Sequence, residues 1–148
     1  MPNSYARRTQ ELQKLLRSQS LDALVVTSPA DWYYLTGFTG EAGTLVASQR
    51  HLTLVTDGRF TVQAAGELHG VRVVEQKEGL YRSCGELLKN LRARKVGFDP
   101  NQVSVGHCQL LKRAAGKATQ FKQVAGLVAR LRARKEPAEL AQMRKAAL

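Results

Sequence analysis

The side chains that most often carry out catalysis are few and scattered in this 148-residue chain. Hydrolysis by bound metal ions needs carboxylates and histidines that converge on the ions. The three histidines, His51, His69 and His107, fall in separate expected elements. The sequence has no HExxH pair, no Cys/His set with zinc spacing and no GxSxG nucleophile turn. We therefore predict no self-contained active site, and we interpret each histidine as solvated or singly hydrogen-bonded.

The clearest chemical signal is a pair of short motifs, YLTGFTG at residues 34–40 and TDGRF at residues 56–60. A short helix is expected to end at Gly37, and glycines at 37, 40 and 43 allow a positive φ without strain. Their GxxGxxG spacing matches neither a P-loop nor a dinucleotide fingerprint. Phe38 lies between two of these glycines, where we expect little core to cover it.

The second motif places a charged pair after an apolar run. Asp57 is predicted to cap a helix that begins at Gly58. Arg59 would then lie in the first turn, where the helix dipole disfavours a cation. This misfit suggests that Arg59 serves a purpose other than helix stability.

Periodicity and turn residues predict the elements that position these motifs. Helices are expected at 5–19, 30–36, 58–68, 80–92, 104–115, 124–135 and from 137 onward. Strands are expected at 22–27, 44–48, 52–56, 71–75, 95–98 and 119–122, the last as an edge strand. Ser4 and Ser104 are the expected caps of the first and fifth helices. Residues 32–34 are Trp-Tyr-Tyr, so at least one ring should be partly exposed and available for an interface.

The alternation of strands and helices predicts a three-layer α/β fold. We expect a mixed, mostly parallel sheet of about five or six strands, with one antiparallel hairpin and helices on both faces. The link 49–51 is short enough for that hairpin. Pro137 begins a helix at its preferred first position, and we interpret that helix as the start of a further domain.

Composition and charge exclude several classes of protein. No apolar run approaches the roughly 20 residues that span a bilayer, and residues 1–13 lack a signal-peptide core. Two isolated cysteines predict no disulfide framework, so a cytoplasmic location is expected. Residues 89–148 hold fourteen Lys and Arg against three Asp and Glu, while residues 1–88 are balanced. Aromatic residues for base stacking are almost absent from the basic half, so nucleic-acid binding is not the favoured interpretation.

Residues 31–40 and 54–64, which contain both motifs, resemble the N-terminal domain of the creatinase/prolidase/aminopeptidase P family. The family pattern is roughly YLTGFTG followed by TDGRY and then QA, and this chain has Phe60 in place of the usual Tyr. The segment 131–140 is similar to the stretch that leads into the family's catalytic domain. The resemblance covers nearly the whole chain. It implies a creatinase/prolidase N-terminal domain at 1–134 and the first helix of an absent C-terminal metallopeptidase domain, of pita-bread fold, at 135–148.

The resemblance also implies a function. A full-length parent would hydrolyse Xaa-Pro peptide bonds, as a dipeptidase or an aminopeptidase, with two divalent metal ions, commonly manganese. Those metal ligands lie in the C-terminal catalytic domain, so none is assigned in this chain, and the fragment alone is expected to be inactive. The N-terminal domain would mediate a homodimer and shape the rim of an active site, often the partner subunit's. A sibling activity such as creatine hydrolysis shares this domain and stays open.

By position, the candidate rim residues are Phe38, Thr39, Gly40 and Arg59. Phe38 would supply an apolar wall, and the planar guanidinium of Arg59 would pair with a carboxylate of the Xaa-Pro peptide. The alternative is that Phe38 packs under its own loop while Arg59 forms an internal ion pair with Asp57 or Glu41. Two other functions also stay open: a stand-alone, non-catalytic binding module and, with less support, a basic nucleic-acid-binding domain.

Overall fold

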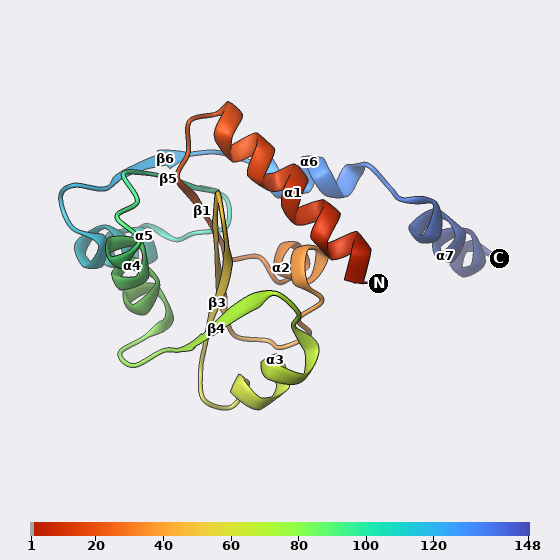
Figure 1. Ribbon diagram of the computed structural model, residues 1–148, viewed down its shortest axis with the longest axis horizontal. Helices are drawn as coiled ribbons and strands as arrows, with labels where there is room; N and C mark the ends of the chain where they lie inside the picture. Colours follow the sequence, from red (N-terminus) through yellow and green to blue (C-terminus); the bar gives the residue numbers. More distant parts are fainter. Residues whose placement is uncertain (1) are drawn as a thin grey trace.

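A six-stranded sheet in the order β4-β3-β2-β1-β5-β6 forms the centre of the computed structural model, which describes residues 2–148 (Figure 1). The strands are β1 (Ala23–Val26), β2 (Thr44–Ser48), β3 (Leu52–Thr56), β4 (Val71–Glu75), β5 (Lys95–Phe98) and β6 (Gln120–Gln123). Strand β2 is antiparallel to both of its neighbours, and the other three pairings are parallel. This confirms a mixed, mostly parallel sheet, the hairpin between β2 and β3, and β6 as an edge strand.

Helices cover both faces of the sheet. They are α1 (Pro2–Ser18), α2 (Pro29–Thr36), α3 (Thr61–Glu67), α4 (Leu80–Asn90), α5 (Val105–Ala115), α6 (Leu127–Ala133) and α7 (Pro137–Ala147). One core cluster joins the sheet to α1, α2, α3 and α6, and a second joins it to α4 and α5. The predicted three-layer α/β fold is therefore confirmed.

Strand β1 shows why the two faces form separate cores. Its four residues are all buried, as expected for a strand covered on both sides. Because side chains alternate along a strand, Leu24 and Val26 join the first cluster while Ala23 and Val25 join the second. A short apolar run thus stabilises both layers.

Three predicted helix starts are wrong. Helix α6 begins at Leu127 rather than at residue 124. Helix α1 already includes Ser4, so that hydroxyl is inside the first turns rather than at a cap. Helix α3 begins at Thr61 rather than at Gly58, and residues 58–60 form a turn before it. By contrast, the Ser104 hydroxyl accepts a hydrogen bond from the His107 amide at 3.1 Å, which confirms the predicted cap of α5.

The last helix, α7, extends away from the body of the molecule (Figure 1). None of its residues is buried, and Leu140 and Met143 are among the exposed apolar side chains. Within the described residues, every helix is too short or too polar to cross a bilayer.

Candidate functional site

The fold brings the two sequence motifs together at one corner, which we call the motif corner and define as residues 37–43 and 56–60. The Phe38 ring lies edge-on to the Phe60 ring, with 6.4 Å between centroids. The Thr56 hydroxyl donates to the Ala42 carbonyl at 2.6 Å, which ties the end of β3 to the loop before β2. Two segments some twenty residues apart in the sequence therefore form one surface.

Phe38 is fully buried, so the expectation that little core would cover it is wrong. Its ring packs against Trp32 as well as Phe60. Gly40 supplies the space, because a Cβ there would lie only 2.1 Å from Phe38 Cζ. Gly37 alone of the three loop glycines has a positive φ, +79°, and its amide closes α2 by donating to the Tyr33 carbonyl at 2.8 Å.

Thr39 is exposed at the tip of this loop and is fastened to α3. Its amide donates to Glu67 Oε2 at 2.9 Å, and its hydroxyl donates to the other oxygen of the same carboxylate. Gln63 Nε2 donates to Thr39 Oγ1 at 2.8 Å. The hydrogen bonds from Thr39 hold the pKa of Glu67 below its ordinary value. Sequence reasoning missed Glu67, although Gln63 and Glu67 have the i, i+4 spacing that places both on one helix face.

Arg59 lies on the exposed side of the motif corner, where 78% of its side chain is accessible to solvent. Its guanidinium pairs with Asp57, with Nη2 to Oδ2 at 2.8 Å and Nε to Oδ1 at 3.1 Å. Asp57 Oδ1 also accepts from the Arg59 amide at 2.9 Å. Asp57 therefore caps a turn within the motif, and its predicted role as the cap of α3 is wrong. The bonds from Arg59 hold the pKa of Asp57 below its ordinary value.

These contacts show the internal packing of Phe38 and the internal ion pair of Arg59 that were the alternative to rim roles. They leave Arg59 and Thr39 exposed on the outer side of the corner. An exposed ion pair contributes little to stability, so its guanidinium can exchange one carboxylate for another at small cost. The surface offers the Arg59 guanidinium and the Thr39 hydroxyl. Gly40 is buried against the Phe38 ring, so the expectation that it would be open to a ligand is wrong.

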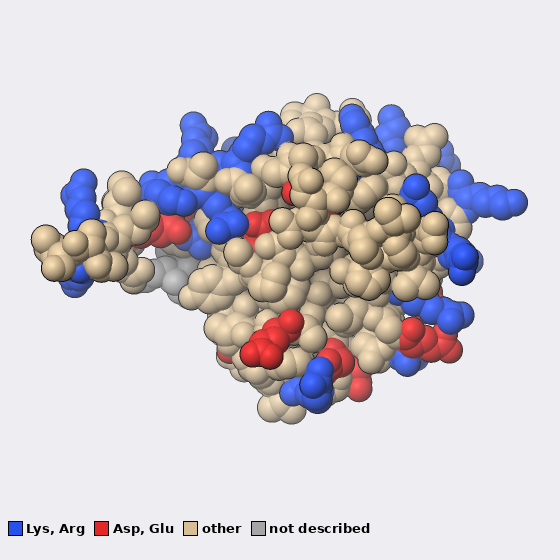
Figure 2. All heavy atoms as spheres, turned by 180° about the vertical axis from the view of Figure 1, so that it is seen from behind, with Lys and Arg blue, Asp and Glu red and all other residues tan. Residues whose placement is uncertain are grey.

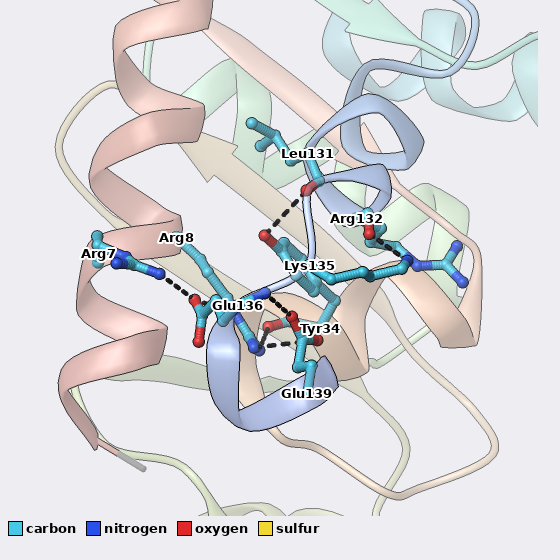
Figure 3. A network of polar contacts seen from close by, with 8 residues as sticks. All are labelled: Arg7, Arg8, Tyr34, Leu131, Arg132, Lys135, Glu136 and Glu139. Carbon is cyan, nitrogen blue, oxygen red and sulfur yellow. Dashed lines mark hydrogen bonds and ion pairs between the residues drawn. The ribbon is translucent and has the colours of Figure 1, made fainter. Parts of the chain in front are cut away.

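A second polar region joins α1, α2 and the segment before α7 (Figure 3). We call it the junction, and it is formed by Arg7, Arg8, Tyr34, Leu131, Arg132, Glu136 and Glu139. Its centre is Arg8, whose side chain is only 10% exposed. Arg8 Nη1 donates to the Tyr34 carbonyl at 2.8 Å, and its guanidinium lies 4.2 Å from the centroid of the Tyr34 ring. Arg8 also pairs with Glu136 and Glu139, each at 3.3 Å.

Glu136 links the junction to the start of α7. Its side chain and that of Glu139 form a capping box, with the Glu136 amide donating to Glu139 Oε2 at 2.9 Å. Arg7 Nη2 lies 2.6 Å from Glu136 Oε1. Partial burial acts to raise the pKa of Glu136, but the hydrogen bonds from Arg7 and Arg8 outweigh it and the net pKa is lowered. The junction therefore holds the start of α7 against α1.

Two further contacts close the junction around α6. The Tyr34 hydroxyl donates to the Leu131 carbonyl at 3.3 Å, and burial raises the pKa of that phenol. Arg132 pairs with Asp31 at 3.0 Å. The sequence analysis did not single out Arg8. Its i, i+4 spacing from the buried Leu12 was the signal that it lies on the inner face.

No group of three or more His, Cys, Asp and Glu side chains that could hold a metal ion occurs within residues 2–148. The histidines lie apart, and His107 stacks on Tyr81 with 3.9 Å between ring centroids. Both cysteines are free thiols. The fold and its surface thus define an α/β domain that has an exposed arginine at the motif corner and holds the start of α7 at the junction, without a metal centre among its described residues.

Comparisons with known proteins agree with this class. The model of the creatinase/prolidase N-terminal domain matches residues 8–134, and the chain belongs to this family. A probable Xaa-Pro aminopeptidase P from Pyricularia oryzae is 30% identical over 124 residues, which cover 74% of this chain but 20% of that protein. The recognition of the family from residues 31–64 is therefore confirmed.

Solved structures show the same fold. The N-terminal domain of the cytoplasmic peptidase PepQ from Mycobacterium tuberculosis superimposes with a TM-score of 0.79 at 28% identity, covering 84% of this chain and 98% of that one. An Xaa-Pro dipeptidase from Bacillus anthracis has a TM-score of 0.85 at 23% identity, covering 93% of this chain and 38% of that one. The chain thus spans a small part of the full-length relatives that it matches.

Proposed function

We propose that this chain is the accessory N-terminal domain of a proline-specific metallopeptidase, and that it shapes the rim of the active site. The observation that carries this is the motif corner: in a domain of this family, two motifs from separate elements converge and leave Arg59 exposed. The parent would hydrolyse Xaa-Pro bonds, in line with the printed names of its relatives.

The chemistry of the parent would come from outside the described residues. The family resemblance implies two divalent metal ions, commonly manganese, in a C-terminal catalytic domain. The donors in residues 2–148 do not fit such a centre, because they form no cluster. We assign residues 1–134 to the N-terminal domain and 135–148 to the first helix of the catalytic domain, which the junction would orient.

At the rim, each motif residue would have a distinct part. Arg59 would exchange Asp57 for a carboxylate of the peptide substrate, since the planar guanidinium suits that ligand. Thr39 would line the entrance, held by its hydrogen bonds to Glu67, and Gly40 would act only by making space for Phe38 beneath the loop. Phe38 would act from beneath, as the apolar support of the loop. A homodimer would bring this rim to a partner's site, and the exposed Tyr33 would contribute to the interface.

The test compares the 148-residue chain with the full-length product of its reading frame, each supplied with manganese and Xaa-Pro substrates. We expect activity only in the longer protein. Arg59→Ala in that protein should raise KM about tenfold, as expected for loss of a charged hydrogen bond to substrate. Arg82→Ala is the matched control, because Arg82 also pairs with a neighbouring carboxylate on the surface but lies outside the motif corner.

Two results would contradict the proposal. Proline release by the 148-residue chain would show a catalytic centre within it. Unchanged kinetics in Arg59→Ala would remove Arg59 from the rim. The expected homodimer is checked by light scattering of the longer protein, and the expected cytoplasmic location by fractionation of cells that produce it.

A further inference from the structure

A basic trough lies at the β6 edge of the sheet, far from the motif corner. It has a volume of about 970 Å³ and is lined by five cations: Lys95, Lys112, Arg113, Lys117 and Lys122. The trough lies where β5 and β6 begin, whereas the motif corner follows the end of β3. Strands β3 and β5 run in the same direction, so the two surfaces occupy opposite ends of the sheet.

The trough contains the free edge of strand β6. Gln120, Phe121 and Lys122 are consecutive and all line it, although successive side chains of a strand point to opposite faces. Its walls also come from both helical layers, from Gln19 just after α1 and from Lys112 on α5. Because residues from both faces of the sheet line the trough, the trough encloses the edge of β6 that lies between those faces.

The backbone of β6 is unpaired on this side. The Gln120 amide donates to Arg94 and the Val124 amide donates to Phe98, both toward β5. Because hydrogen-bonding direction alternates along a strand, the amides of Phe121 and Gln123 point away from β5. No strand lies beyond β6 in the described chain. These groups can pair with an added strand.

The charge of the trough is of one sign. No Asp or Glu lines it, and none of its five cations forms an ion pair within residues 2–148. Figure 2 shows Lys and Arg side chains gathered on the right of the molecule, the end at which α5 and β6 lie. Lys112 and Arg113 complement the dipole at the end of α5, but Lys95, Lys117 and Lys122 have no such local role.

We propose that the basic trough binds an extended acidic polypeptide segment, which adds to the sheet beside β6. The open edge supplies backbone hydrogen bonds, and the lysines select alternating acidic side chains. Single-stranded nucleic acid fits the surface less well, because base stacking needs exposed aromatic rings. The only aromatic residue of the trough is Phe121, which is half-buried with its ring 6.3 Å from that of Phe98.

The test uses a short fluorescent peptide of alternating Glu and Val, titrated with the 148-residue chain and followed by anisotropy. The same peptide with N-methylated backbone amides keeps the charge but cannot form the ladder. A single-stranded oligothymidylate of equal charge is the competing probe. We expect binding of the first peptide, with affinity falling as salt rises, and clearly weaker binding of the other two probes.

Two variants separate charge from backbone pairing. The first is a triple variant with Lys112→Glu, Lys117→Glu and Lys122→Glu. It should bind the Glu-Val peptide at least about tenfold more weakly, since attraction between opposite charges becomes repulsion between like charges. The matched control reverses the charge at three other lysines by substitution to Glu: Lys14, Lys77 and Lys89, which are exposed and lie outside the trough. It has the same net charge and should bind as the unmodified chain does.

Gln123→Pro removes an outward amide, and proline is tolerated on the free side of an edge strand. This variant should bind the Glu-Val peptide about fivefold more weakly, which is the effect expected from one lost hydrogen bond. Equal loss in both charge-reversal variants, or equal binding of the N-methylated peptide, would overturn the proposal. Tighter binding of oligothymidylate would also overturn it in favour of nucleic acid. An unchanged circular dichroism spectrum verifies that each variant is folded.

Discussion

The motif corner and the junction each use an arginine against carboxylates, yet the two arginines are suited to different purposes. Arg59 is 78% exposed and binds Asp57, which lies two residues away. Arg8 is 10% exposed and binds residues that are 26 to 131 positions away in the sequence. The comparison shows that burial and sequence separation, rather than residue type, distinguish an ion pair that ties distant segments together from one that stays open to solvent.

The contacts that hold the motif corner and the junction in place also differ. At the motif corner, polar groups face solvent and a buried aromatic cluster around Phe38 carries the loop. At the junction, the polar network itself fills the space between α1, α2 and the start of α7 (Figure 3). Loss of an apolar contact should therefore damage the first region most, and loss of a charge should damage the second.

The largest effect is expected from Phe38→Ala, which would empty the core of the motif corner. Truncation of a fully buried Phe should lower the free energy of unfolding by about 3–5 kcal/mol. Urea denaturation of the 148-residue chain measures this. The control is Tyr33→Ala, because Tyr33 is exposed and should matter much less. Equal losses in both variants would contradict the burial-based contrast.

Arg8→Ala should have the next largest effect, because it leaves the buried Tyr34 carbonyl without its donor and the Glu136 carboxylate with Arg7 alone. We expect a loss of about 2–3 kcal/mol. Arg8→Lys should recover little, since a single ammonium cannot reach the carbonyl and both carboxylates as the guanidinium does. Arg7→Ala is the matched control, because Arg7 is mostly exposed. The comparison would fail if Arg7→Ala were as damaging as Arg8→Ala.

A pH titration should resolve the contribution of Glu136. Its folded pKa lies below the ordinary value of 4.5, so its stabilising effect is complete above that pH and is lost as the pH falls through the lowered pKa. Glu136→Gln should cost about 1 kcal/mol near neutral pH and much less in acid. Thermal unfolding across the acid range measures the difference. A constant difference between the two proteins at all pH values would contradict this assignment.

The smallest effect on stability is expected from Arg59→Ala. Solvent screens its pair with Asp57, so the denaturation midpoint should stay within error of the unmodified chain. The same variant should raise the KM of the proposed longer peptidase, so it would separate an effect on function from an effect on stability. A clear loss of stability would show that Arg59 supports the fold, which would weaken its proposed role at the rim.

Local signals in the sequence were sufficient for much of the fold. Each strand was predicted close to its observed position, since apolar runs between turn residues identify buried strands without knowledge of their partners. Ser104 and Pro137 marked helix starts because capping depends on residues within one turn. The two motifs were sufficient to identify the family, and the match over residues 8–134 agrees.

Only the tertiary structure decided how the sites are built. The burial of Phe38 depends on Trp32 and Phe60, and the space around it depends on Gly40. The partners of Arg8 and the two-layered walls of the basic trough come from segments far apart in the chain. Periodicity and capping report interactions within a few residues. Burial, long-range ion pairs and an open sheet edge depend instead on which distant segments pack together.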